Sequence, residues 1–304
     1  MMQTDRQPAD AAAPATESIL GFTVSGRHAR GRVMRIGATL DAILHAHAYP
    51  EPLARLLAEA LVLTALVGST LRGDEGQMTL QAQAQGGPVD LLVCDYRDGE
   101  LRGYLRFDPA RIDEVGPQAR LETVFGKGYL AITLDQTVTH DRYQGIVPLE
   151  GDTLAHAVES YFDTSEQIPT LLRVGIARDA AGAWTAGGLL VQHLPSGEVG
   201  GPRLHVERAH PDWEHMLALA GSTSPAELVD AGLPLDVLLW RLFHEDETRV
   251  VPPVELTRGC RCSADYIRGV LSRFSEPQLT DMRESNGQVK VDCAFCAVSF
   301  HIDV

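Results

Sequence analysis

The chain has 304 residues, of which 44% are hydrophobic and 22% are charged. This balance is typical of a soluble globular protein with a sizeable core, and the length allows two domains or one large domain with appendages. The formal net charge is −15, from 26 basic and 41 acidic residues. Such an acidic balance argues against nucleic acid and anionic membrane surfaces as partners.

The N-terminal stretch is rich in alanine, proline and polar side chains, and no basic region in it is followed by an apolar one. We therefore predict a disordered tail over residues 1–18 and no signal peptide. The most apolar segment, residues 53–71, contains Arg55 and Glu59, so only its second part, residues 60–71, is free of charge. That part is too short to cross a bilayer. With no export signal, the cysteines are expected to be free or metal-bound in a reducing cytoplasm.

Residues 19–205 are predicted to form an α+β domain of mixed or antiparallel sheets with helices. Apolar residues cover most of the circumference of the helix expected at 53–71, which indicates deep burial. Residues 77–85 alternate between apolar and polar, as in a half-buried strand. Short turns then lead to further strands, so the chain forms an antiparallel meander. The remaining elements are expected near residues 23–25, 30–36, 89–96, 101–107, 129–134, 143–149, 152–162, 171–177 and 184–193.

Residues 206–259 are predicted to form a helical linker, in which proline and glycine separate short apolar helices. Ser224 begins a capping box, with proline at the first helical position. Three short helices this apolar cannot build a core of their own, so we expect them to lie on the preceding domain. Their apolar side chains are candidates for binding other proteins: Trp213, Leu217, Leu238, Leu239 and Trp240.

Four of the five cysteines lie in two short pairs near the C-terminus. Cys260 and Cys262 form a C-x-C motif, and Cys293 and Cys296 form a C-x-x-C motif further along the chain. This arrangement is typical of a tetrahedral zinc site with four thiolate ligands, and it predicts one Zn²⁺ per chain. Buried thiols, or the disulfides of a secreted protein, fit less well because no export signal precedes them. Four thiolates leave no open position for a catalytic water, which argues against a hydrolytic zinc enzyme.

Residues 260–304 are predicted to form a small zinc-binding module with two short helices and two strands. So small a module buries little apolar surface, and zinc would supply most of its folding free energy, roughly 10 kcal/mol by comparison with zinc-finger peptides. Zinc also keeps the sulfurs as thiolates, the form that oxidants attack. Within each pair the sulfurs are near enough in sequence to form a local disulfide. Spacing alone leaves open an inert structural site and a redox-sensitive one.

Other chemical motifs are weak. Cys94 lies in an apolar strand and is expected to be a buried spectator. The chain has no nucleophile elbow, no paired zinc-binding histidines and no dinucleotide fingerprint, so we do not expect an enzyme. A thiol oxidoreductase would need a thioredoxin-like βαβ context, which is missing. The alternative function is a constitutive zinc ribbon that binds nucleic acid, but basic and acidic residues balance within residues 256–304.

Several stretches together resemble a known family. They are Gly76-Gln77-Met78-Thr79-Leu80-Gln81, Leu101-Arg102-Gly103-Tyr104, Tyr143-Gln144-Gly145-Ile146-Val147, Ser165-Glu166-Gln167 and the final C-x-C and C-x-x-C pairs. Over residues 19–304 the chain closely resembles the heat-shock protein 33 family of chaperonins, the redox-regulated molecular chaperones of bacteria.

The resemblance implies a holdase chaperone without ATPase activity. Oxidants would form two local disulfides, Cys260–Cys262 and Cys293–Cys296, and release zinc. The zinc module and then the linker would unfold, and the protein would bind unfolding clients as a homodimer in the cytoplasm during oxidative stress. The apolar linker residues, Trp240 among them, would then be uncovered together with the surface beneath them.

Overall fold

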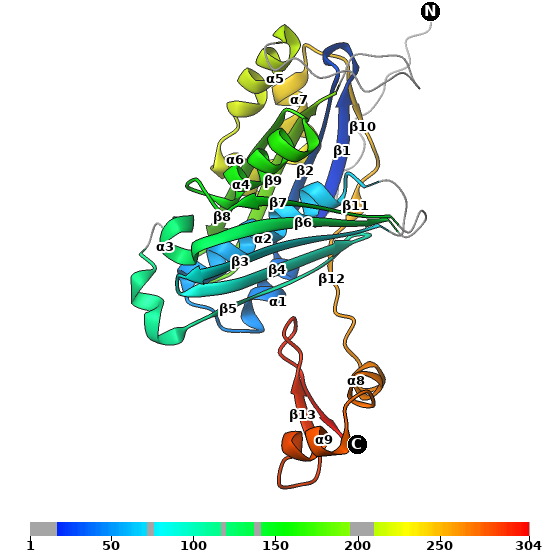
Figure 1. The fold of residues 1–304 in the computed structure, drawn as a ribbon. Helices are drawn as coiled ribbons and strands as arrows, with labels where there is room; N and C mark the ends of the chain where they lie inside the picture. Colours follow the sequence, from blue (N-terminus) through cyan, green and yellow to red (C-terminus); the bar gives the residue numbers. More distant parts are fainter. Residues whose placement is uncertain (1–16, 72–75, 117–119, 137–140, 195–209, 304) are drawn as a thin grey trace, which may run out of the picture.

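The computed structural model describes residues 17–71, 76–116, 120–136, 141–194 and 210–303. Within these residues, two six-stranded sheets form the body of the protein, and a two-stranded sheet lies in a C-terminal module (Figure 1). The predicted tail lies mostly outside the described residues. The first strand begins at Ser18, one residue before the predicted start of the α+β domain.

The first sheet has the strand order β10-β1-β2-β9-β8, and β11 also pairs with β1. Every pairing in it is antiparallel. Both of its faces are buried, because its side chains belong to the main core on one side and to a second hydrophobic cluster on the other. The strand bounds are β1 (Ser18–Val24), β2 (Ala29–Ile36), β8 (Thr170–Arg178), β9 (Trp184–His193), β10 (Thr248–Val250) and β11 (Val254–Glu255).

The second sheet has the strand order β12-β5-β4-β3-β6-β7. The predicted antiparallel meander is confirmed, because β4 pairs with both β3 and β5. One face of this sheet is apolar and faces the core, whereas the outer face carries the polar residues of the alternating pattern. The strand bounds are β3 (Gln77–Gly86), β4 (Val89–Arg97), β5 (Glu100–Phe107), β6 (Gly126–Gln136), β7 (Asp141–Pro148) and β12 (Thr257–Arg258).

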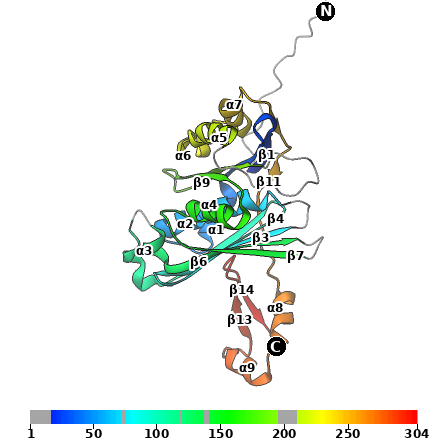
Figure 2. The same ribbon diagram turned by 45° about the horizontal axis from the view of Figure 1, so that its top comes forward.

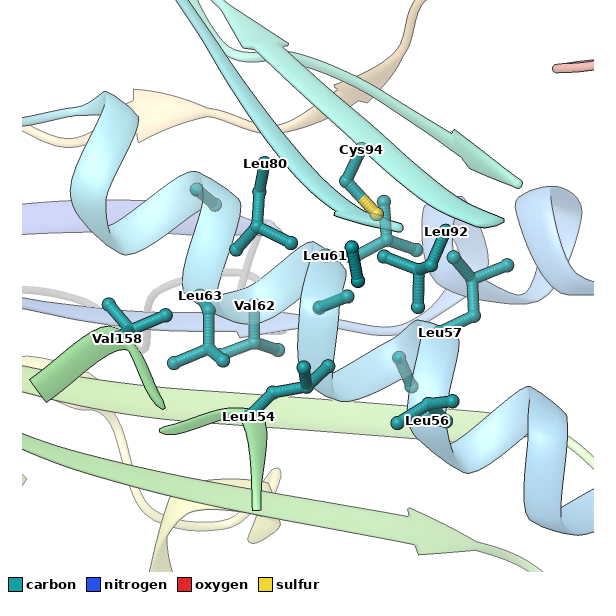
Figure 3. Close-up of a cluster of buried hydrophobic side chains, with 14 of the residues drawn as sticks. Leu56, Leu57, Leu61, Val62, Leu63, Leu80, Leu92, Cys94, Leu154 and Val158 are labelled. Carbon is teal, nitrogen blue, oxygen red and sulfur yellow. The ribbon is translucent and has the colours of Figure 1, made fainter. Parts of the chain in front are cut away.

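Helix α2 (Glu51–Gly68) lies between the two sheets, which is why a helix that is apolar on nearly all sides is stable here. Figure 3 shows its leucines beside Leu80 and Leu92 of the second sheet. Cys94 belongs to the same cluster and is fully buried, as predicted. No described helix is both long and apolar enough to cross a membrane. The shorter helices of the body are η1 (Ser25–Arg27), α1 (Ala38–His45), η2 (Pro109–Glu114), α3 (Leu121–Phe125), α4 (Leu154–Tyr161) and η3 (Phe162–Glu166).

The linker helices cover the face of the first sheet that α2 leaves free (Figure 1). They are α5 (Pro211–Gly221), α6 (Pro225–Val229) and α7 (Leu235–Phe243). Their buried side chains and those of β1, β2, β8 and β9 form one hydrophobic cluster. The prediction that these helices lie on the preceding domain is therefore confirmed. Residues 206–209 of the predicted linker lie outside the described residues.

After α7, the last helix of the predicted helical linker, the chain is extended. It contributes β10 and β11 to the edge of the first sheet and β12 to the edge of the second. β-branched residues favour this conformation, and Pro252 and Pro253 lie between β10 and β11, where no strand pairing requires their amide hydrogens. Leu256, between β11 and β12, is 2% exposed and belongs to the main core. The end of the linker is thus anchored to both sheets.

The C-terminal module projects from the body next to β5 and β12 (Figures 1 and 2). It contains α8 (Ala264–Leu271), α9 (Glu276–Met282), β13 (Val289–Asp292) and β14 (Ser299–Ile302). Its hydrophobic cluster is small and separate from the other two, as predicted for a module that depends on a metal. The buried members are Ile267, Leu271, Leu279, Val289 and Ile302.

Candidate metal centre and the docked linker

The four predicted cysteines lie together in one cluster. The Sγ atoms of Cys260 and Cys262 are 3.2 Å apart, that of Cys260 is 3.6 Å from Cys293, and that of Cys262 is 3.4 Å from Cys296. All four sulfurs lie within 4.8 Å of one another. A tetrahedral site with Zn–S bonds of about 2.3 Å has sulfurs about 3.8 Å apart. The cluster is therefore positioned to hold a metal ion.

Local structure places each pair. Cys260 and Cys262 lie in the extended stretch between β12 and α8, and the Ser263 hydroxyl caps α8 by accepting the Tyr266 amide at 3.1 Å. Cys293 and Cys296 lie in the turn between β13 and β14. The Cys293 carbonyl accepts the amide of Ala297 at 2.8 Å. Ala297 has the left-handed φ of 57° that closes the turn.

The electrostatics of the cluster favour a bound cation. Burial raises the pKa of Cys262 and of Cys296. At Cys260 the same effect of burial is outweighed by hydrogen bonds from the Cys262 amide and the neighbouring thiols, which lower its pKa to about 7. Four thiolates this close repel one another, and a divalent cation removes that repulsion. A closed set of four soft sulfur donors fits Zn²⁺.

Sulfur positions alone do not choose a disulfide pairing. The distance between Cys260 and Cys262 favours a local bond, but Cys260 is nearly as close to Cys293 and Cys262 to Cys296. Any of these pairs could approach bonding distance after small movements, provided that the Cα atoms reach the separation a disulfide needs, about 4.4–6.8 Å.

The predicted apolar linker residues divide into two groups. Trp213 is 5% exposed, Leu238 and Leu239 are each 1% exposed, and Leu217 is partly buried against the same cluster. Trp240 differs from the prediction, because its side chain is 65% exposed and its ring lies 5.1 Å from that of His244. One residue after Leu239, a helical rotation of about 100° turns Trp240 away from the sheet.

Close backbone contacts hold α6 flat against the first sheet. A Cβ atom at Gly175 would lie 2.2 Å from the carbonyl oxygen of Pro225, and one at Gly187 would lie 2.2 Å from that of Leu228. Any larger residue at either strand position would force the helix away. These two glycines therefore make room for the docked linker.

Arg35 of β2 binds the end of α6. Its guanidinium donates to the carbonyl oxygens of Leu228 at 2.8 Å, Leu233 at 2.8 Å and Glu227 at 3.1 Å. The residue is only 6% exposed, and burial lowers its pKa. Carbonyls at a helix end need partners from outside the helix, and Arg35 supplies them. Sequence patterns did not predict this role; the available signal was a charged residue in line with Gly31 and Val33 on a buried strand face.

A second polar contact fixes the two ends of the linker helices. Arg27 pairs with Asp212 of α5 at 3.0 Å and with Asp246 after α7 at 2.8 Å. Asp246 also accepts from His215 at 3.0 Å. The hydrogen bond from Arg27 holds the pKa of Asp212 below its usual value. The linker is thus held by apolar contacts, close backbone packing and buried polar groups together.

Comparison with known proteins identifies the family. The family model described as Hsp33 protein matches residues 17–303. A 33 kDa chaperonin from Caulobacter vibrioides is 40% identical over 292 residues, covering 94% of both chains. One from Escherichia coli is 34% identical over 268 residues, covering 88% of this chain and 85% of that one. The crystal structure of the 33 kDa chaperonin from Thermotoga maritima has the same fold, with a TM-score of 0.76, 21% identity, and 94% and 95% of the two chains covered. This chain belongs to the Hsp33 family.

Proposed function

We propose that the chain is a redox-regulated, ATP-independent holdase chaperone of the cytoplasm. One observation carries the proposal: the linker that covers an apolar face of the first sheet continues directly into the four-cysteine module. The state of the cysteines can thereby decide whether that face is covered. Membership of a family whose curated relatives are named 33 kDa chaperonin supports a role in binding unfolded proteins.

In the reduced state, Cys260, Cys262, Cys293 and Cys296 hold one Zn²⁺. The ion supplies the positive charge that keeps four thiolates together and most of the folding free energy of residues 260–304. The chain itself supplies the geometry, through the turn at Ala297 and the capped start of α8. The folded module then keeps the end of the linker next to β5.

Oxidation removes the ligands in pairs. Cys260 with Cys262, and Cys293 with Cys296, each lose two electrons as an S–S bond forms. With peroxide as the oxidant, its O–O bond breaks, and two protons complete two molecules of water. Disulfide sulfurs bind zinc far more weakly than thiolates, so the metal leaves and the module loses its main source of stability.

Loss of the folded module weakens the docking of the linker. The chain after β12 is then no longer fixed, so β12 and Leu256 are held only by their contacts with the body. Helices α5, α6 and α7 would leave the first sheet, exposing the apolar residues on both sides of the contact. Unfolding proteins would bind this surface, with the activated chaperone as a homodimer, and the net charge of −15 would keep the complexes dispersed. The surface includes Phe22, Val33 and Leu189 on the sheet, and Trp213, Leu217, Leu238 and Leu239 on the linker.

The test compares reduced and peroxide-treated protein at raised temperature. A chromogenic chelator measures zinc release, and light scattering measures the aggregation of an unfolding client without ATP. We expect one zinc to leave per chain and aggregation to be suppressed only after oxidation. Cys94→Ala is the control and should respond like the wild type, because Cys94 lies in the main core. If zinc leaves while the client aggregates as before, the chaperone proposal is wrong.

A further inference from the structure

Within the described residues, two sets of side-chain contacts join the cysteine module to the body, besides the chain itself. In the first, the guanidinium of Arg261 donates to the side-chain oxygen of Gln77. The second is formed by Phe295, which lies between Cys293 and Cys296 in the C-x-x-C turn. The hydrophobic cluster of the module contains module residues alone. The position of the module on the body therefore depends largely on these few contacts.

Phe295 binds a preformed site on the outer face of the second sheet. The Arg102 guanidinium carbon lies 4.1 Å from the centre of the Phe295 ring. The Tyr104 ring meets it edge-on, with centroids 4.9 Å apart and an interplanar angle of 83°. The Phe295 carbonyl accepts from His47 Nε2 at 3.4 Å. We call this set of interactions the Phe295 contact. Both ring interactions have favourable geometry.

Other residues of the body hold Arg102 in place. Asp95 accepts from its Nε at 2.8 Å and from its second terminal nitrogen at 2.6 Å, which fixes the plane of the guanidinium. Asp95 itself is 5% exposed and accepts from the Thr79 hydroxyl at 2.7 Å. Arg102 is thus oriented on the sheet whether or not Phe295 is present. Binding the ring requires little further ordering on the body side.

On the module side, the metal site sets the position of the ring. Cys293 and Cys296 flank the turn, and its backbone bonds run from the Cys293 amide to Val298 and from the Ala297 amide to Cys293. A disulfide between the two cysteines, or the loss of a shared metal, would change this turn and move Phe295. Two sites that share one rigid turn must stabilise each other equally.

We propose that the Phe295 contact couples the metal site to the body, so that contact with Arg102 and Tyr104 slows the loss of metal and metal binding holds the module against β5. This inference rests on the proposed function, because it names the contact through which ligand loss reaches the linker. The same contact sets how readily the reduced protein is activated. Removing it should make the module release zinc and leave β5 more easily, without changing any ligand.

The test is a double-mutant cycle on reduced, zinc-loaded full-length protein. Phe295→Ala removes the ring from the module and Tyr104→Ala removes its partner from the body. Arg102 is left in place, because buried Asp95 would lose its partner. The first readout is the rate of zinc transfer to a chelator. The second is amide hydrogen exchange at Thr257 and Gly259, which donate to Gly99 and Leu101 of the second sheet.

Phe295→Ala should release zinc roughly tenfold faster than the wild type, because it removes both ring interactions. Tyr104→Ala should release zinc about threefold faster, because the Arg102 interaction stays in place. The double variant should be no faster than Phe295→Ala alone, because both changes remove one contact. Exchange at Thr257 and Gly259 should rise in parallel. Val298→Ala is the control: it lies in the same turn, is 49% exposed and should match the wild type.

Unchanged zinc release in Phe295→Ala would overturn the inference. Additive effects of the two substitutions would also overturn it, because Phe295 would then act inside the module alone. Failure here is distinguishable from failure of the chaperone proposal, which is tested on oxidised wild-type protein by client aggregation.

Discussion

Replacing Arg35 with methionine should release the linker while leaving the metal site intact. Arg35→Met keeps the apolar stem but removes the donors that bind the carbonyls of Leu228, Leu233 and Glu227. In the docked state those carbonyls would lose their partner. In the undocked state water solvates both the carbonyls and residue 35, so the cost of the substitution falls on docking.

The magnitude follows from the number and type of bonds lost. A hydrogen bond with one charged partner contributes about 1.5–3 kcal/mol. Burial of the Arg35 guanidinium carries a desolvation cost, which also lowers its pKa. The net contribution of Arg35 to docking is therefore smaller than the sum of its three hydrogen bonds. If Arg35→Met lowers the free energy of linker docking by about 3–4 kcal/mol, the undocked population rises by roughly 100- to 1000-fold.

Limited proteolysis of reduced, zinc-loaded protein measures this population. Cleavage between residues 210 and 254 should accelerate strongly in Arg35→Met, with zinc content unchanged. Arg106→Met is the matched control, because Arg106 is an exposed strand residue whose ion pair with Asp90 lies on the surface, and such pairs contribute little. If both variants are cleaved at the wild-type rate, Arg35 does not hold the linker.

Three further predictions concern the ligands, the packing of α6 and the effect of pH. Cys262→Ser should weaken zinc binding by orders of magnitude in a chelator competition and speed linker proteolysis in the reduced protein; unchanged cleavage would contradict the dependence of the linker on the module. Gly175→Ala should displace α6, because the new methyl group would lie 2.2 Å from the Pro225 carbonyl oxygen. Gly26→Ala is the control, because a Cβ atom there would have nothing within 4 Å. Equal amide hydrogen exchange of α6 in the two variants would refute the packing argument. Burial by the docked linker lowers the pKa of His193 below its usual 6.5, so the undocked state binds more protons and docking should weaken as the pH falls below about 6.5. Linker proteolysis at pH 5.5 and 7.5 checks this, and His193→Phe should lose that part of the pH dependence. The titratable and charged groups that face His193 are His28, His210 and Asp212.

Local patterns in the sequence were sufficient for the elements whose stability depends on neighbours in the chain. The apolar circumference of α2, the alternation in β3 and the capping box at Ser224 each predicted an element that the structure contains. Cysteine spacing likewise predicted a four-sulfur cluster, because cysteines so close in the chain must lie on the same side of a metal.

Tertiary structure alone decided which surfaces meet. No strand was predicted within residues 248–258, because their strands depend on pairing with the edges of β1 and β5. The partners of Arg35 and Phe295 could not be predicted from local sequence, since the groups they contact lie far away in the chain. Trp240 of the linker was expected to be covered in the docked state, but its position on α7 turns it toward solvent. Periodicity identifies the apolar face of an element, whereas long-range packing selects which surface covers that face, and no short stretch of sequence contains that information.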